Sequence, residues 1–327
     1  MTTETGTTRR RLLAHLGLLG VAGGALFMVR DRLPWPPLEP RFANGRDTPW
    51  LRLPEQGGLI DIPVTVNGAP IRAVVDSGAQ FSAIDRGLAD KLGLPRTVAA
   101  PILAYGVSGA PSLTHTVRLD LSLPGLHIPH LRAAALDLAA ISAATGRDFQ
   151  LLIGRDVLRH LIVEADFPRG RARFLARAAH RPPRDATVIP LKMRGGAPMA
   201  AVEIEGRPPF EVLVDTGASG LLALSSKAAE NAGLLAPGRK VASAHSVSLG
   251  GLSLDRMVEA RTLRVGGMTL HGAEIQVYTP TANAPAPSGL LGAGFFRQFR
   301  LALDLGGEKL FLVRPGLIIV PMPEPPA

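Results

Sequence analysis

Val74-Val75-Asp76-Ser77-Gly78-Ala79 is the stretch on which the fold of this chain depends, and Leu213-Val214-Asp215-Thr216-Gly217-Ala218 repeats it. Each stretch is an apolar, strand-like run that ends in Asp, a hydroxyl residue and Gly. An Asp-(Ser/Thr)-Gly triplet occurs by chance in roughly one chain in seven of this length, so a single copy carries little weight. The pair is informative because a second copy stands 139 residues further along the chain.

The neighbours of the two triplets also repeat, in the same order. The matched landmarks are Asn67-Gly68 with Glu205-Gly206, Leu92-Gly93-Leu94 with Ala232-Gly233-Leu234, Leu152-Ile153-Gly154 with Leu290-Leu291-Gly292, and Asp166 with Asp304. The offsets stay between 138 and 140 residues. Such a registered series predicts a duplicated unit of about 130 residues, and hence two homologous lobes.

Short β-like runs separated by turn residues fill both lobes. Residues 60–66 and 268–278 are examples, and the turn dipeptides ahead of the Asp-bearing runs favour hairpins. Short helices are expected after each Asp triplet and after each apolar-apolar-Gly step, at residues 85–92, 155–161, 225–232 and 295–299. The sequence therefore predicts a mainly β fold with a few short helices. Asp166 and Asp304 each precede a turn, so we expect them to be structural.

Proline-rich and basic segments mark the expected boundaries. The segments are an export signal or membrane anchor at 1–33, a Pro-rich spacer at 34–55, a first lobe at 56–178, a linker at 179–186, a second lobe at 187–320 and a Pro-rich tail at 321–327. The spacer and the linker contain prolines that a helix interior does not tolerate.

The first segment has the features of an export signal. Arg9-Arg10-Arg11 precedes an apolar stretch from Leu12 to Val29, and the paired Arg ahead of two Leu resembles a twin-arginine signal. A helix of that length spans about 27 Å, close to the hydrocarbon core of about 30 Å, so cleavage and retention as an anchor both stay open. We expect an exported protein, periplasmic or anchored to the inner membrane facing the periplasm. The alternative is an ordinary buried first helix.

Composition argues against several classes of function. The net charge is +9, but the basic residues are scattered and only 5 of 36 are Lys, which indicates compositional bias and argues against a nucleic-acid partner. The chain has no Cys, and its eight His show no metal-ligand spacing. We expect no metal and no cofactor. Ser108 and His115 lack the surroundings of a serine hydrolase.

The paired Asp residues suggest a specific chemistry. One Asp from each half of a duplicated protein can face its counterpart across a pseudo-two-fold axis. Carboxyls about 3 Å apart cannot both ionise, so they share a proton. The ionised member can then remove a proton from water while the protonated member polarises a carbonyl oxygen.

These features resemble the aspartic proteases, particularly the retroviral-type proteases and their bacterial relatives. The resemblance covers residues from about 57 to 315 as two copies. It implies two closed, barrel-like β lobes, the acid protease fold, with Asp76 and Asp215 as the catalytic pair. By the same likeness Ser77 and Thr216 would brace the two loops through their hydroxyls.

The resemblance extends to the turns and the flaps. Gly78 and Gly217 would be the turn glycines, and residues 152–154 and 290–292 the strands beneath each loop. The flap, a hairpin that closes over substrate, would contain Tyr105, Gly106 and Gly109 in the first lobe, and Gly250 and Gly251 in the second. Tyr105 is either a flap tyrosine or an ordinary packing residue.

The sequence departs from pepsin-like enzymes just after each triplet. Ala79 and Ala218 stand where pepsin-like enzymes usually carry Ser or Thr. In having Ala at this position the sequence resembles the retroviral-type enzymes. With fewer donors to the charged form, we expect activity nearer neutral pH than that of a digestive pepsin. The next position is Gln80 in the first lobe and Ser219 in the second. The two loops therefore need not support their Asp residues equally.

We therefore expect an aspartic endopeptidase that binds an extended polypeptide by strand addition and acts as a monomer, since one chain supplies both halves. Membrane association would come only from the first segment. The alternative is a non-catalytic envelope protein that holds peptides on a degenerate scaffold of the same fold.

Overall fold

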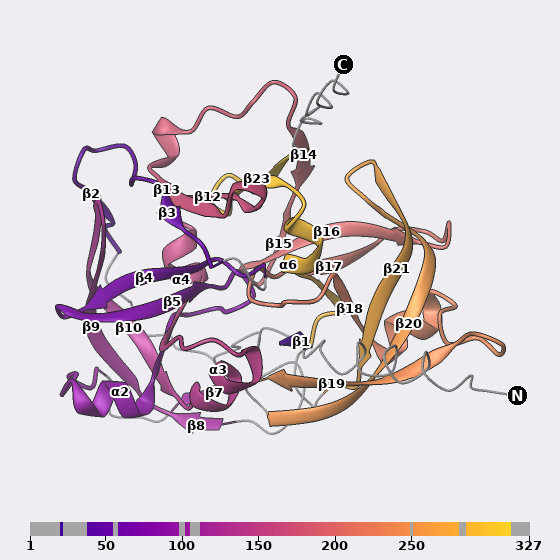
Figure 1. Ribbon diagram of the computed structural model, residues 1–327, viewed down its shortest axis with the longest axis horizontal. Coiled ribbons are helices and arrows are strands. Elements are labelled where there is room, and N and C mark those ends of the chain that lie inside the picture. Colours follow the sequence, from indigo (N-terminus) through magenta and orange to yellow (C-terminus); the bar gives the residue numbers. More distant parts are fainter. Residues whose placement is uncertain are drawn as a thin grey trace, which may run out of the picture.

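Two β lobes lie side by side, and a third sheet spans both of them (Figure 1). The computed structural model describes residues 20–21, 38–54, 58–97, 102–104, 112–248, 251–280 and 286–314. Strands dominate these residues and the helices among them are short, so the mainly β, two-lobed fold expected from the sequence is confirmed.

The first lobe is a closed ring of six strands. The sheet runs β2-β10-β6-β11-β5-β4-β9, and the additional pairing of β9 with β10 closes the ring. The six strands of the ring are β4 (Asp61–Val66), β5 (Ala69–Val75), β6 (Ala83–Asp85), β9 (Thr116–Leu123), β10 (Leu126–Leu136) and β11 (Leu151–Ile153), and β2 (Arg41–Phe42) pairs with β10 outside the ring. The turn between β4 and β5 consists of Asn67 and Gly68, both at positive φ, as a two-residue hairpin loop requires.

The second lobe closes in the same way. Here β16, β17, β22, β18, β21 and β20 follow one another, and β20 pairs back to β16. The strands are β15 (Lys192–Arg194), β16 (Ala197–Ile204), β17 (Phe210–Val214), β18 (Leu222–Ser225), β19 (Val241–Ser248), β20 (Gly251–Val265), β21 (Met268–Tyr278) and β22 (Gly289–Leu291). Glu205 and Gly206 repeat the positive-φ turn of the first lobe.

A six-stranded sheet joins the lobes, and local sequence pattern did not predict it. It consists of β14 (Thr187–Pro190), β24 (Lys309–Val313), β23 (Arg300–Asp304), β12 (Ile162–Asp166), β13 (Arg171–Leu175) and β3 (Leu51–Arg52), in that order. β12 of the first repeat pairs antiparallel with β23 of the second. The sheet therefore fixes the orientation of one lobe against the other.

Two acidic residues of this sheet, Asp166 and Asp304, have the structural role expected of them. Asp166 accepts hydrogen bonds from the guanidinium groups of Arg169 and Arg171. Asp304 accepts one from Arg177 at 2.9 Å and one from the backbone N–H of Gly307 at 2.8 Å. Both carboxylates thus hold turns at strand ends.

Four of the five described helices fall where the sequence placed them. α2 (Arg86–Lys91) and α5 (Ser226–Asn231) follow the Asp loops and are capped by the side chains of Asp85 and Ser225. α4 (Arg155–Leu158) and α6 (Ala293–Phe296) begin directly after a glycine, and α6 starts two residues earlier than expected. α3 (Ala139–Thr145) was not expected, since its N-cap residue makes no side-chain hydrogen bond.

Most of the expected export segment lies outside the described residues. Of its apolar stretch the structure describes Gly20 and Val21, which form a short strand, β1, parallel to β19 rather than a helix. Among the described residues there is no helix with the length and apolar character needed to cross a membrane.

Candidate active site

The two Asp-bearing loops are built in the same way. β5 and β17 each end just before the Asp, and each pairs in parallel with a short strand, β11 or β22. The backbone N–H of Asp76 donates to the carbonyl of Ile153, and that of Asp215 to the carbonyl of Leu291, both at 2.9 Å. The strands expected beneath the loops are thus the ones that hold them.

Ser77 and Thr216 connect the loops across the lobe junction. The hydroxyl of Ser77 donates to the carbonyl of Val214 at 2.7 Å, and that of Thr216 donates to the carbonyl of Val75 at 2.8 Å. Each hydroxyl also accepts the backbone N–H of the other residue at 3.0 Å. All four bonds are buried, so the loops are held in one relative position.

Gly78 and Gly217 are required by how closely the loops approach. A Cβ atom on Gly78 would lie 2.5 Å from Cγ of Asp215, and one on Gly217 would lie 2.4 Å from Cγ of Asp76. Carbon atoms in contact sit about 3.5–4.0 Å apart, so a methyl group at either position would collide with the carboxyl of the other lobe.

Each carboxyl is fixed by two backbone donors of its own loop. Oδ1 of Asp76 accepts from the N–H groups of Gly78 and Ala79 at 2.8 and 3.0 Å. Oδ1 of Asp215 accepts from Gly217 and Ala218 at 2.9 and 3.1 Å. Ala79 and Ala218, which stand where pepsin-like enzymes usually carry Ser or Thr, therefore each donate one backbone hydrogen bond to the carboxyl of their own loop.

The two carboxyls lie close together at the junction of the lobes. Asp76 and Asp215 are 1% and 0% exposed and are within hydrogen-bonding reach of each other. Burial raises the pKa of both carboxyls, and the charge of Asp76 raises the pKa of Asp215 further. Oδ2 of Asp215 meets no protein donor among the described residues. A proton held between the carboxyls would satisfy this oxygen, so the geometry suits a pair that shares one proton.

Arg155 lies beside this pair, and the sequence analysis did not single it out. It is the first residue of α4 and is 5% exposed. Its Nη1 donates to the carbonyls of Ser77 and Gly78 at 3.3 and 3.2 Å. A charged residue at the start of a helix usually indicates a solvated face, so the sequence offered no reason to place Arg155 at the site. The available signal was that the equivalent position of the second repeat carries Ala293.

The expected flap residues fall at hairpins that the structure describes only in part. Tyr105, Gly106 and Gly109 lie outside the described residues, between the paired strands β7 (Ile102–Ala104) and β8 (Ser112–Thr114). Gly250 also lies outside them, and Gly251 begins β20, which pairs with β19 from Gly251 to Val258.

The β19–β20 hairpin reaches across to the first lobe, where β19 ends near α3 (Figure 1). Val247 is 7% exposed and belongs to an apolar cluster with Leu138 and Ile141 of the first lobe. The same cluster contains Val74 and Ala293, which flank the two Asp loops. The hairpin is therefore closed against the lobe that it faces.

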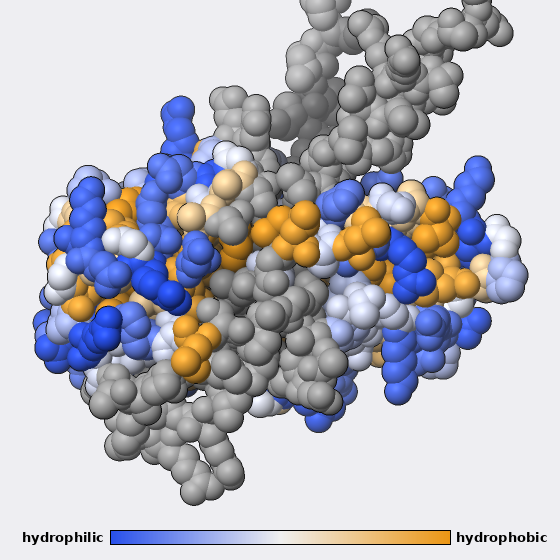
Figure 2. Space-filling view, turned by 90° about the horizontal axis from the view of Figure 1, so that it is seen from below, coloured by the Kyte–Doolittle hydropathy of each residue, from blue (hydrophilic) through white to orange (hydrophobic). Residues whose placement is uncertain are grey.

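A groove of about 940 Å³ begins beside the second loop, at Ser219 and Gly220. Its walls come from both lobes, with Gly146 and Arg147 on one side and β20 and β21 on the other. Seen from below, apolar side chains gather on both lobes of the molecule (Figure 2). The groove lining includes both charged and apolar side chains, among them Glu259, Glu274 and Leu270.

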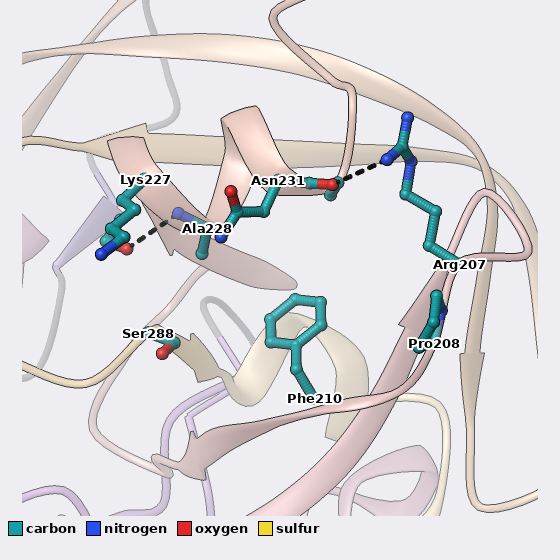
Figure 3. Close-up of a pocket in the computed structure, with 9 residues that line it drawn as sticks. Arg207, Pro208, Phe210, Lys227, Ala228, Asn231 and Ser288 are labelled. Carbon is teal, nitrogen blue, oxygen red and sulfur yellow. Dashed lines mark hydrogen bonds between the residues drawn. The ribbon is translucent and has the colours of Figure 1, made fainter.

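A separate pocket of about 430 Å³ lies on the second lobe (Figure 3). It is lined by Arg207, Pro208, Phe210, Ser225, Lys227, Ala228, Asn231, Ala232 and Ser288. Neither Asp loop contributes to its walls, so it is distinct from the candidate active site. Within the described part of the chain, no three His, Cys, Asp or Glu side chains gather as metal ligands would.

Two fused β lobes with paired Asp-(Ser/Thr)-Gly loops at their junction define a protein of the retropepsin-like aspartic protease class. The chain belongs to the aspartyl protease family, whose model matches it twice, over residues 62–157 and 200–295. One match therefore falls on each lobe.

Individual relatives match a smaller part of the chain. DNA damage-inducible protein 1 of Cryptococcus neoformans var. neoformans serotype D is 33% identical over 103 residues, which is 31% of this chain and 22% of the relative. The protein of the same name from Phaeosphaeria nodorum is 27% identical over 118 residues, 36% of this chain and 25% of the relative. The matches thus span about a quarter or less of these curated relatives.

Proposed function

We propose that the protein is an aspartic-type endopeptidase that hydrolyses peptide bonds with a water molecule activated between Asp76 and Asp215. The observation that carries the proposal is the placement of the two carboxyls. They are buried, they are within hydrogen-bonding reach, and each is held by two backbone donors. Family membership supports a protease-like role.

In the proposed reaction the ionised carboxylate removes a proton from water as the water oxygen attacks the peptide carbonyl carbon. The protonated carboxyl donates its hydrogen to the carbonyl oxygen, which takes up the electron pair of the C=O double bond. Collapse of the tetrahedral intermediate re-forms a C=O bond and breaks the C–N bond. The amine leaves with a proton from one carboxyl, and a hydroxyl of the intermediate returns its proton to the other carboxyl, which restores the pair. The hydroxyl brace between Ser77 and Thr216 keeps the carboxyls at a fixed separation during these steps.

We propose an extended polypeptide as the substrate, bound by strand addition near the β19–β20 hairpin and along the groove beside Ser219. Because both carboxyls are buried and the tip of this hairpin is packed against the first lobe, we propose that the hairpin lifts to admit substrate. Hairpin opening would therefore precede catalysis.

One chain supplies both Asp loops, so we propose that a monomer is sufficient. We also propose that the basic and apolar start of the sequence directs export, to the periplasm or to the periplasmic face of the inner membrane. Fractionation of cells that express the full chain, with the Arg9 and Arg10 pair intact or changed to Lys, tests this. Unchanged cytoplasmic location of both forms would contradict export.

The central experiment is cleavage of a peptide library by the purified full chain, with Asp76→Asn and Asp215→Asn beside it. Each substitution should abolish turnover, because an amide can neither accept the proton of water nor return one. Asp137→Asn, at an exposed position in the first lobe, is the matched control and should keep full activity.

A pH profile completes the test. Burial raises the pKa of both carboxyls, so we expect a bell-shaped profile with its maximum in the weakly acidic to neutral range. Peptide binding without cleavage at any pH would instead favour a peptide-holding module. A maximum below about pH 3 would contradict the proposed state of the pair.

A further inference from the structure

One buried difference between the two halves of the active site lies directly beside the Asp loops. Gly154 and Gly292 are equivalent residues, and each directly precedes a short helix. The next residue donates its backbone N–H to the equivalent alanine of the Asp loop, Arg155 to Ala79 at 2.9 Å and Ala293 to Ala218 at 2.7 Å. The backbone is thus the same in both lobes, while one lobe carries a guanidinium group and the other a methyl group.

The guanidinium group binds the far side of the two peptide groups that hold Asp76. Arg155 donates to the carbonyl of Ser77, and the N–H of that same peptide group, on Gly78, donates to Oδ1 of Asp76. Arg155 also donates to the carbonyl of Gly78, and the N–H of that same peptide group, on Ala79, donates to the same oxygen of Asp76. Each peptide group therefore has a cation at its oxygen and a carboxylate at its N–H.

Hydrogen bonds in such a chain polarise one another, most of all when a charge stands at one end and water is excluded. Arg155 is 5% exposed and Asp76 is 1% exposed, so solvent does little to screen the interaction. In the second lobe the N–H groups of Gly217 and Ala218 hold Asp215 in the same way. Ala293, which occupies the position of Arg155, has no donor to place against their peptide carbonyls.

We propose that Arg155 is a positioning residue that breaks the symmetry of the pair, so that Asp76 carries the negative charge and Asp215 carries the shared proton. This assignment deepens the proposed function and rests on it. It makes Asp76 the group that removes a proton from water and Asp215 the group that donates to the carbonyl oxygen.

The charges around the pair support Asp76 as the ionised member and Asp215 as the protonated member. Among the influences on Asp76, Arg155 lowers the pKa of the carboxyl, whereas the charge of Asp76 raises the pKa of Asp215. The other charged or titratable groups nearby are Asp156 and Arg159 on or next to α4, Tyr278 on β21 and Asp255 on β20. Burial lowers the pKa of Arg155 to about 10, so the guanidinium stays charged at neutral pH.

The first experiment needs no turnover. Protein labelled with ¹³C at the Asp side-chain carboxyl carbons is titrated by NMR, and the signals of the pair are assigned from those that disappear in Asp76→Asn and in Asp215→Asn. We expect the Asp76 carbon to report the lower of the two macroscopic steps. If the Asp215 carbon reports the lower step, the proposal is overturned, whether or not any Arg155 variant folds.

The second experiment separates charge from hydrogen bonding. Arg155→Gln keeps an amide donor but removes the charge, and Arg155→Lys keeps the charge. We expect Arg155→Gln to raise the lower step by about one pH unit, and Arg155→Lys to raise it by less than half as much. Arg177→Gln, which removes the cation that pairs with Asp304, is the control and should leave the step unchanged.

Kinetics extend the same comparison. If the chain cleaves peptides, the acid limb of its kcat/KM profile should move upward in Arg155→Gln by the shift seen in NMR. A shift no larger than that of Arg177→Gln would overturn the role of Arg155 while leaving peptidase activity intact. Failure of the unsubstituted chain to cleave any peptide would instead contradict the proposed function, and the NMR titration would still decide the role of Arg155.

Discussion

Ser77 and Thr216 stand 139 positions apart in sequence and each donates its backbone N–H to the hydroxyl of the other at 3.0 Å. The hydroxyl of Ser77 in turn donates to the carbonyl of Val214, and the hydroxyl of Thr216 donates to the carbonyl of Val75. The bonds run both ways between the lobes, so a displacement of either loop would stretch all four. This exchange makes the spacing of the carboxyls a property of the whole lobe junction.

Removing one hydroxyl of this brace should cost stability and activity together. Ser77→Ala leaves the N–H of Thr216 and the carbonyl of Val214 without their buried partner, and each such group costs about 1–3 kcal/mol. Denaturant unfolding and kcat measure the two effects. Ser122→Ala, which removes a hydrogen bond to His127 within the first lobe, should change kcat little. A kcat of Ser77→Ala equal to that of the control would contradict the role of the brace.

A methyl group on either turn glycine should push the loops apart. Because the added Cβ would lie within about 2.5 Å of the opposite carboxyl, Gly78→Ala and Gly217→Ala should each destabilise the fold by about 1–3 kcal/mol. A displacement near 1 Å can lower a rate roughly 100-fold, so we expect a loss of that order in kcat. Gly87→Ala, in α2, serves as the control, because its Cβ would lie 3.2 Å from the capping Oδ1 of Asp85 and within 4 Å of neither Asp76 nor Asp215, so kcat should change little.

Asp156 should make stability depend on pH. Burial raises its pKa to about 6, although Ser82 donates two hydrogen bonds to Oδ1. The folded protein therefore holds this proton above the pH at which the unfolded chain releases it. The free energy of unfolding falls as pH rises from about 4 through 6.

Asp156→Asn tests that dependence because it removes the charge and keeps an acceptor. We expect it to stabilise the protein at pH 7.5 by about 1–3 kcal/mol, since each pKa unit corresponds to about 1.4 kcal/mol, and to have little effect at pH 3. Urea unfolding at both values measures the difference. Asp137→Asn is the exposed control. An equal effect of Asp156→Asn at both pH values would speak against the assignment.

Val247 should control how readily the β19–β20 hairpin opens. Val247→Ala removes apolar volume from the cluster that also contains Leu138 and Ile141, and we expect faster hydrogen exchange of the β19 amides with little change in β21. Val241→Ala changes the same residue type in the same strand at a side chain that is 46% exposed. Exchange in β19 that is equally fast in both variants would show that the Val247 contacts do not hold the hairpin.

Local signals in the sequence were sufficient for much of the fold. Asn67-Gly68 and Glu205-Gly206 predicted the hairpins that deliver the Asp loops, and the structure confirms both turns at positive φ. Helical patterns after each Asp triplet predicted α2 and α5, and the structure shows that the side chains of Asp85 and Ser225 cap them. These features depend on residues that are neighbours in the chain, which is why a sequence reveals them.

The rest depends on partners that are distant in sequence. β12 meets β23 at a separation of about 138 residues, and nothing within either strand specifies the other. Arg155 acts on Asp76 through peptide groups of another segment, so its role became visible only when the carbonyls of Ser77 and Gly78 were placed beside it. The paired acids themselves were identifiable because the duplication places an Asp-(Ser/Thr)-Gly triplet in each half of the chain. Whether they catalyse hydrolysis stays a prediction.

Covalent fusion of the two halves has a genetic consequence. In a symmetric homodimer every mutation is made twice, so an arginine that helps one acid would also appear beside the other. In this polypeptide positions 155 and 293 have separate codons and have come to encode arginine and alanine. Selection can therefore adjust either side of the reaction centre alone.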